Sequence, residues 1–260
     1  MTYINHKQKD NKLRNQIDEA IVQFSKTLVT PLTQLQETDL ANIMYKTLKF
    51  NQALNYSYES ALLAVTPETL LDVYTLRSKI YKKMGYNKEF PDHIEGINFD
   101  YYDEYAAVLY TQTNGKLTGT CRVIFDSEYK LPIDKNFSLD YLRVHENKLA
   151  ELSRLMIEDE TKGLNLEFKH LTIGVYMVML VNNHTTLMSV MKEEHFSLYE
   201  KFGGFGKEAS LQTYGDIESP FIITAWEVLK ISKFFKKIFL GSKDRNPVSK
   251  GWDSFDKLVS

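Results

Sequence analysis

Residues 150–158 read AELSRLMIE, an apolar run that carries an acid, Glu151, and a base, Arg154. The run predicts a buried β-strand over residues 149–157. Charged side chains seldom lie in a buried strand, because an unpaired charge away from water is very costly. We therefore expect other charged residues to meet Glu151 and Arg154 in the folded chain.

Three charged features upstream are candidates for these partners. Arg77 lies on the apolar stripe of a helix that a Thr-Pro start and a terminal Gly predict over residues 67–84. Asp100 and Asp103 lie in the motif FDYYD, and Arg122 lies in GTCRVIF. Together with the pair in the strand, they make three acids and three arginines, whose charges sum to zero. Such a set fits two interpretations: a neutral buried network that holds a loop against the sheet, or a site that binds a charged substrate.

The strand sets a geometric condition on its charged pair. In a regular strand, positions i and i+3 point to opposite faces. Glu151 and Arg154 share a face only if a β-bulge lies between them. We predict this bulge at residues 152–153 and expect it to separate the strand from its neighbour in the sheet.

The remaining pattern indicates an α/β or α+β protein built on one sheet. Apolar residues recur every three to four positions through residues 1–55, which predicts a helical N-terminal extension. Strands are expected at 59–65, 105–111, 117–125, 149–157, 186–191, 210–214 and 221–226. Helices are expected at 67–84, at 161–183 with apolar residues on every side, and at 195–202.

Three parts follow from this order: a helical extension at 1–55, a sheet domain at 56–228 and a C-terminal part at 229–260. The last part contains an amphipathic helix with the basic residues Lys230, Lys233, Lys236 and Lys237, followed by a polar tail. This segment has three interpretations: a docking face for an acidic carrier protein, a contact with an anionic membrane surface, or a solvated helix face.

The composition argues against several classes of function. The net charge is −2, so the chain has no basic field to bind nucleic acid generally. The single cysteine, Cys121, leaves no disulfide framework, and the six histidines show no metal-ligand spacing, so no metal site is expected. The sequence has neither a secretory signal nor an apolar run long enough to span a membrane, so we expect a cytoplasmic protein, at the inner membrane surface if the basic segment contacts lipid.

The order of elements, with the segment LYEKFGGF after the fifth strand, resembles the GNAT acyltransferase fold. In that fold the sheet is mixed and mostly antiparallel, strands four and five splay apart, and the pantetheine arm of the thioester lies in the gap. The charged residues resemble the motifs of acyl-homoserine-lactone (autoinducer) synthases and N-acyl amino acid synthases. The matches are Arg77 and Tyr81 for an Arg followed by an aromatic, Asp100 and Asp103 for D-x-x-D, Arg122 for an Arg after a Gly in the next strand, and Glu151 and Arg154 for E-x-x-R. The resemblance covers residues 59–226.

Two departures narrow the resemblance. The autoinducer synthases have a Trp shortly after the first Arg, where this chain has Asn87, and this argues against S-adenosylmethionine as a substrate. The sequence Thr161-Lys162-Gly163 replaces the Gly-rich pyrophosphate loop of acetyl-CoA-dependent enzymes. The pantetheine arm of a carrier protein does not need that loop, because it has no adenosine diphosphate. Long-chain N-acyl amino acid synthases fit both departures best.

The resemblance implies an enzyme that moves a medium or long acyl group from an acyl thioester to the amine of an amino acid. It implies acyl carrier protein or CoA as carrier of the acyl group, an acyl carrier protein as partner, and no permanently bound cofactor. Glu151 is expected as the base or water-orienting group, because the amine must lose a proton before it attacks. The residues expected to bind substrate are Arg77, Tyr81, Asp100, Asp103, Arg122 and Arg154.

Three alternatives stay open at this point. The first is an acyl-homoserine-lactone synthase that uses S-adenosylmethionine, and the second is an ordinary acetyl-CoA N-acetyltransferase. The third is a non-catalytic lipid- or carrier-binding protein with the same fold. Substitution of Glu151 distinguishes the enzymes from the binding protein, because only an enzyme loses turnover while keeping its ligand.

Overall fold

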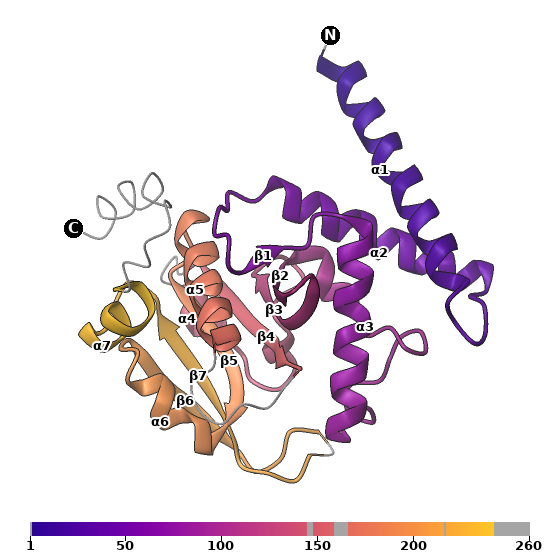
Figure 1. Cartoon of the computed structure of the whole chain (residues 1–260). Helices are drawn as coiled ribbons and strands as arrows, with labels where there is room; N and C mark the ends of the chain where they lie inside the picture. Colours follow the sequence, from indigo (N-terminus) through magenta and orange to yellow (C-terminus); the bar gives the residue numbers. More distant parts are fainter. Residues whose placement is uncertain (1, 145–147, 159–165, 216, 242–260) are drawn as a thin grey trace.

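The architecture is one mixed sheet with helices on both faces (Figure 1). The computed structural model describes residues 2–144, 148–158, 166–215 and 217–241. In these ranges the sheet has seven strands in the order β1-β2-β3-β4-β5-β7-β6. Every neighbouring pair is antiparallel except β4 and β5, which are parallel. The predicted mixed, mostly antiparallel sheet is confirmed.

The strands are β1 (Leu62–Leu63), β2 (Ala106–Thr113), β3 (Lys116–Phe125), β4 (Leu149–Ile157), β5 (Thr186–Lys192), β6 (Phe205–Leu211) and β7 (Phe221–Glu227). The α-helices are α1 (Thr2–Ser25), α2 (Gln34–Ala53), α3 (Pro67–Met84), α4 (Asp140–Arg143), α5 (Leu166–Val181), α6 (Phe196–Glu200) and α7 (Lys233–Phe235). Four other short helical segments are η1 (Tyr101–Tyr105), η2 (Pro132–Lys135), η3 (Glu193–His195) and η4 (Lys236–Leu240).

The first two helices are α1 and α2, and the start of α1 projects from the body of the molecule (Figure 1). Thr33 caps α2 by accepting a hydrogen bond from the Gln36 amide, while the Gln36 side chain accepts one from the Thr33 amide. At α3, Thr66 is the cap, Pro67 takes the first helical position, and Gly85 ends the helix with a φ of 73°. The predicted boundaries of α3 are confirmed.

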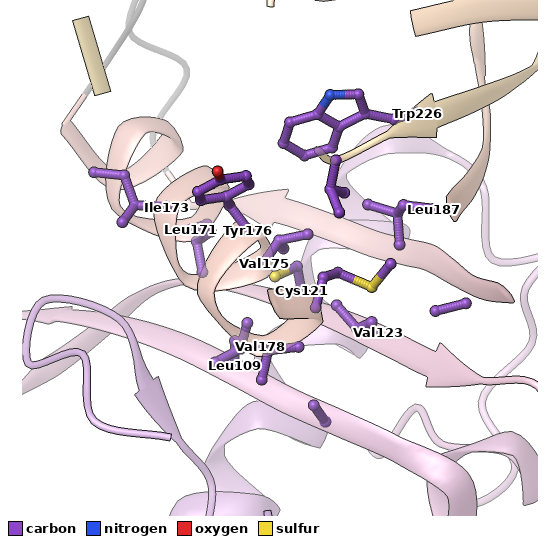
Figure 2. Packing of buried hydrophobic residues seen from close by; sticks show 14 of the residues in the cluster. Leu109, Cys121, Val123, Leu171, Ile173, Val175, Tyr176, Val178, Leu187 and Trp226 are labelled. Atoms are coloured by element: carbon purple, nitrogen blue, oxygen red, sulfur yellow. The ribbon is translucent and has the colours of Figure 1, made fainter. Parts of the chain in front are cut away.

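The helix α5 lies across one face of the sheet (Figure 2). Its residues Leu171, Val175 and Val178 belong to one buried cluster with Cys121 and Val123 of β3. The opposite face of the sheet is covered by α3, η1 and the connection between β3 and β4. The chain therefore builds two different environments on the two sides of β4.

The strands β4 and β5 separate part of the way along their length. Pairing begins with Leu149 opposite Thr186 and ends with Leu152 opposite Ser189, although both strands continue beyond these residues. The predicted splay of strands four and five is therefore confirmed. It leaves a gap in the middle of the sheet.

A bulge in β4 lies at a different place from the one predicted. Ser153 pairs with Arg122 in regular register, and the register shifts immediately afterwards. Arg154 lies inside this shift with a left-handed φ of 53°. The prediction of a bulge at residues 152–153 is wrong, because Ser153 Oγ accepts a hydrogen bond from Arg122 Nε at 3.0 Å and stays in register. The bulge at residues 154–155 still turns Glu151 and Arg154 toward one face.

Two C-terminal elements also differ from the sequence-based expectation. β6 begins at Phe205, before the expected strand at 210–214, because Gly203 and Gly204 both adopt positive φ and form a tight turn there. The expected amphipathic helix is the short pair α7 and η4. The start of the helix expected at Thr161-Lys162-Gly163 and the polar tail after residue 241 lie outside the described residues. Within the described ranges, no helix has the length and apolar content to cross a membrane.

Candidate active site

Two buried arginines share one aspartate on the α3 side of the sheet. Asp103 Oδ1 accepts a hydrogen bond from Arg77 Nη1 at 2.8 Å, and Asp103 Oδ2 accepts one from Arg122 Nη1 at 3.1 Å. The three side chains are at most 3% exposed. A carboxylate between two guanidinium groups offsets the cost of burying these charges. Asp103 is thus the anionic partner that the inward position of Arg77 on α3 requires.

Asp100 extends this network to the bulge of β4. Its carboxylate accepts hydrogen bonds from Arg122 Nη1 and from Arg154 Nη2, both at 2.6 Å. Burial alone would raise the pKa of Asp100, but the two guanidinium groups outweigh it and hold that pKa well below its usual range. Asp100 also caps η1, because its Oδ1 accepts a hydrogen bond from the Tyr102 amide at 2.9 Å. The FDYYD motif therefore forms the η1 turn and also supplies both carboxylates that bind the arginines of the network.

Arg154 is held in place by two further side chains. Its guanidinium donates a hydrogen bond to the side-chain oxygen of Asn98 and lies 5.6 Å from the centre of the Tyr81 ring. Asn98 is fully buried and donates a hydrogen bond to the Phe90 carbonyl at 3.0 Å. Sequence reasoning missed Asn98. The available signal was a lone polar residue between two apolar ones, just before the D-x-x-D motif.

Glu151 faces the same side of the sheet as Arg154, and among the described residues it forms no ion pair. It is 4% exposed, and its Oε2 accepts a hydrogen bond from the Ile133 amide at 2.8 Å. Burial raises the pKa of Glu151 to about 8, while the Ile133 amide and the charge of Arg122 oppose the rise. A carboxyl group with this pKa exchanges a proton near neutral pH, as general acid–base chemistry requires.

A cavity of about 680 Å³ reaches both faces of the sheet at the gap between β4 and β5. Its lining on the charged face includes five of the seven expected site residues: Tyr81, Asp100, Arg122, Glu151 and Arg154. Its lining on the α5 face is mainly apolar and includes Leu152, Val175, Leu187, Phe202 and Trp226. Because Glu151 and Leu152 are neighbours in a strand, they face opposite sides, so a cavity lined by both must pass through the sheet, which is open beyond the last β4–β5 pair at Leu152. Arg77 and Asp103 are not part of the lining.

A chain of aromatic rings extends the lining beyond Tyr81. Phe90 stacks on Tyr81 with 4.7 Å between ring centres, and Tyr214 lies 5.9 Å from Phe90. Burial, together with the charge of Glu151, raises the pKa of Tyr214 to about 12. Sequence reasoning missed both residues as site residues: Phe90 lies in an irregular segment, and Tyr214, expected at the end of a strand, lies beyond β6 in an isolated bridge with Ile217. In the part of the chain that the structure describes, no group of three or more potential ligands is placed to hold a metal ion.

The lysines expected to dock a carrier protein are exposed on the C-terminal segment: Lys230, Lys233, Lys236 and Lys237. Lys230 pairs with Glu227 at 2.7 Å, whereas the other three have no acidic partner within the described residues. The same segment turns Phe235 and Phe239 inward, where their ring centres lie 5.4 and 4.8 Å from that of Phe202. The segment therefore has a basic outer side and an aromatic inner side.

Comparisons with known proteins give a family and a fold. The family model of the N-acyl amino acid synthase FeeM matches residues 72–226. The structure of FeeM, an N-acyl amino acid synthase from uncultured soil microbes, is 21% identical, and the match covers 65% of this chain and 89% of that chain with a TM-score of 0.52. The structure of BjaI, a CoA-dependent acyl-homoserine lactone synthase solved with SAM and isopentyl-CoA, is 14% identical over 70% of this chain and 86% of that chain, with a TM-score of 0.52. No curated protein matches the chain.

Proposed function

This chain belongs to the family of the N-acyl amino acid synthase FeeM, a family of acyltransferases, and we propose that it joins an acyl group from a thioester to the amine of an amino acid. One observation carries the proposal. A single cavity joins buried charged groups on one face of the sheet to an apolar chamber on the other. The proposed reaction has the same division, because it brings a charged amino acid and a long apolar chain together at one carbonyl carbon.

The apolar part of the cavity is the proposed acyl site. Its walls include Val175 of α5 and the stacked rings of Phe205 and Trp226, whose centres are 5.1 Å apart. Each buried methylene of a chain contributes about 0.8 kcal/mol, so such a chamber favours a medium or long acyl group. The thioester would lie in the gap next to Leu152, beyond which β4 no longer pairs with β5. Backbone amides freed in this way can stabilise the oxyanion of a tetrahedral intermediate.

The charged part of the cavity is the proposed site for the amino acid. Arg122 uses Nε, Nη1 and Nη2 within the network, whereas Arg154 lines the cavity and its Nε, a buried atom, has no partner among the described residues. We therefore assign the carboxylate of the acceptor to Arg154, whose guanidinium fork suits that group. The side chain of the acceptor would lie against Tyr81.

Arg77 and Asp103 have a different proposed role, because neither of them lines the cavity. Asp103 holds Arg122, which in turn holds Asp100, and Asp100 holds Arg154. We propose Arg77 and Asp103 as positioning residues of this chain of contacts. The other expected catalytic and substrate-binding residues line the cavity and are proposed to contact substrate: Tyr81, Asp100, Arg122, Glu151 and Arg154.

Glu151 is the proposed general base. The acceptor arrives as an ammonium ion, and Glu151 takes one of its protons directly or through one water and passes it to solvent. The amine then attacks the thioester carbonyl and forms the C–N bond. When the tetrahedral intermediate collapses, the C–S bond breaks, and the thiol leaves with the second proton of the amine. The raised pKa of Glu151, about 8, brings its basicity close to that of an amine.

We propose an acyl carrier protein as the donor of the acyl group. The C-terminal segment exposes three lysines without an acidic partner among the described residues: Lys233, Lys236 and Lys237. The basic surface that they form complements an acidic carrier protein. The inner side of the same segment packs on Phe202, which lines the apolar part of the cavity. A carrier docked here would therefore lie beside the acyl site. A cytoplasmic location is the matching proposal for its place in the cell, and contact of this segment with an anionic membrane surface is the alternative to carrier docking.

The experiment that tests this function uses the purified full chain. Acyl carrier protein and CoA thioesters of medium and long chains are each incubated with single amino acids, and products are identified by mass spectrometry. We expect an N-acyl amino acid and release of a free thiol. An acyl-homoserine lactone formed only with S-adenosylmethionine, or acetyl transfer alone, would contradict the proposal. Binding of acyl thioesters without any turnover would favour a binding protein instead.

A further inference from the structure

The connection between β3 and β4 closes over Glu151. Its η2 turn places the Ile133 amide 2.8 Å from Glu151 Oε2. Within the described part of the chain, this amide is the one hydrogen-bond donor to the Glu151 carboxyl group. The turn therefore has direct control over the orientation and charge of the proposed base.

The η2 turn is itself closed by Asp134. One carboxylate oxygen of Asp134 accepts a hydrogen bond from the Leu131 amide at 3.0 Å, before the turn, and the other accepts one from the Leu139 amide at 3.1 Å, after it. Ile133 lies between these two anchor points. The direction of its N–H group is thus set by where the Asp134 carboxylate is held.

Arg143 connects Asp134 to the sheet. Its Nη1 and Nη2 donate hydrogen bonds to the two oxygens of Asp134 at 2.8 and 2.7 Å. Its Nε and Nη2 donate to the two oxygens of Asp126 at 2.7 and 2.8 Å. Asp126 follows β3 directly, and its amide donates to the carbonyl of Leu149, two residues before Glu151. Two carboxylates held by one guanidinium fork form a rigid link, because each contact is paired and charge-assisted.

We propose that Arg143 and Asp134 are positioning residues for Glu151, and that together they hold the Ile133 amide on its carboxylate. The link runs from the end of β3 through Arg143 and Asp134 to the η2 turn, and from there to β4. This inference rests on the proposed role of Glu151 as base. Neither Arg143 nor Asp134 lines the cavity, so both act through the turn and not on the substrate.

The surroundings of Glu151 fix the direction of the expected change. The ionisable groups that act on it or respond to it are Asp100, Tyr102, Arg122, Asp134 and Tyr214. The Ile133 amide lowers the pKa of Glu151, whereas the charge of Asp134 raises it. Loss of Arg143 releases the amide and leaves the charge of Asp134 uncompensated. Both effects act in the same direction, so the pKa of Glu151 must rise.

The test compares Arg143→Gln and Arg143→Lys with a matched control, Asp140→Asn. Asp140 also contacts Arg143, at 3.2 Å, but it is exposed, and its contacts with described side chains do not include the η2 turn. Two readouts are independent of turnover: the Ile133 amide resonance in isoleucine-labelled protein, and the titration of the Glu151 carboxyl carbon, assigned with Glu151→Gln. A third readout is the pH profile of kcat/KM. Thermal unfolding verifies that each variant is folded.

In the wild type, the Ile133 amide should titrate with the same midpoint as the Glu151 carboxyl group. In Arg143→Gln, we expect this coupling to be lost and the midpoint of Glu151 to rise by about one pH unit, the usual size for one hydrogen bond to a charged group. Arg143→Lys keeps the charge but not the fork, so the Ile133 amide should still be released and the midpoint of Glu151 should lie between those of the wild type and Arg143→Gln. Asp140→Asn should match the wild type.

An unchanged Ile133 resonance and Glu151 midpoint in folded Arg143→Gln would overturn the proposal. Full recovery of both by Arg143→Lys would also overturn it, because charge alone would then be sufficient. Failure of the proposed function has a different signature. In that case the midpoint of Glu151 would move in Arg143→Gln, but Glu151→Gln would retain full activity.

Discussion

Glu151 and Arg154 lie three residues apart in β4, and both side chains face the charged side of the sheet. A regular strand would place them on opposite faces. The β-bulge at residues 154–155 adds one residue to β4, and Arg154, with a left-handed φ of 53°, turns back toward the charged face. Its Nη2 then lies 2.6 Å from Asp100 Oδ2. The same part of β4 is where pairing with β5 has ended. The arrangement of the charges and the opening of the sheet therefore occur at one place.

The buried network makes a prediction about stability. Asp103→Ala removes the carboxylate between Arg77 and Arg122 and leaves two buried guanidinium groups without their shared partner. We expect a loss of about 3–5 kcal/mol in the free energy of unfolding, measured with urea. The control is Glu104→Gln, at the next position, which affects an ion pair with the exposed Lys46 and should cost less than about 1 kcal/mol. Equal effects of the two substitutions would show that the network does not stabilise the fold.

The apolar chamber makes a prediction about chain length. Phe205 lines the cavity and belongs to an edge strand, so Phe205→Ala should enlarge the chamber without removing a central core residue. In a competition between acyl thioesters, we expect preference to shift toward longer chains by about fourfold per added methylene. Leu211→Ala, at the other end of β6 and outside the cavity lining, is the matched control. A product profile that is the same for both variants would place the acyl chain elsewhere.

The basic segment makes a prediction about the donor. We expect the triple variant Lys233→Glu, Lys236→Glu, Lys237→Glu to lower kcat/KM with acyl carrier protein by about tenfold, because docking of an acidic partner is lost. The value with the matching acyl-CoA should stay unchanged. The control reverses three exposed lysines on or near α1, at positions 9, 12 and 26. If both donors lose activity equally, the segment supports the acyl site and does not dock a carrier.

The raised pKa of Glu151 makes a prediction about stability and pH. Burial raises this pKa from 4.5 to about 8, so the folded chain binds the proton more tightly than the unfolded chain does between these two values. Stability must therefore fall as the pH rises through this window. We expect the melting temperature of the wild type to decline relative to that of Glu151→Gln between about pH 5 and pH 9. Parallel curves for the two proteins would mean that Glu151 is ionised at neutral pH.

Local sequence signals predicted much of the fold. The cap at Thr66 and the glycine at Gly85 fixed the ends of α3, and therefore the inward position of Arg77. The need of buried charges for partners correctly predicted that the arginine and aspartate motifs would meet. The same expectation was wrong for Glu151, whose hydrogen-bond partner among the described residues is the Ile133 amide and not a charged group. These features could be predicted from the sequence because each depends either on neighbouring residues or on the free-energy cost of burying an unpaired charge.

Other parts of the site depend on contacts that no local pattern records. The bulge falls after Ser153 because a bond from Arg122, on another strand, holds that residue in register. Asn98 contributes to the site through its side chain, from an irregular segment, and Ile133 through its backbone amide, from the short η2 turn. A backbone amide has no sequence signature at all. Such contacts become visible only when the three-dimensional arrangement is known.

The most direct test of the central claim is a single-turnover comparison of the wild type and Glu151→Gln at about pH 8. Acyl transfer from a bound acyl thioester to the amino acid is followed by mass spectrometry, and thioester binding is measured separately. The control is Glu158→Gln. Glu158 follows β4 directly, and its carboxylate pairs with lysines at the surface. We expect Glu151→Gln to bind the thioester normally and to transfer the acyl group at least about 100-fold more slowly, while the control keeps its rate. Transfer by Glu151→Gln at the wild-type rate would contradict the role of Glu151 as the base.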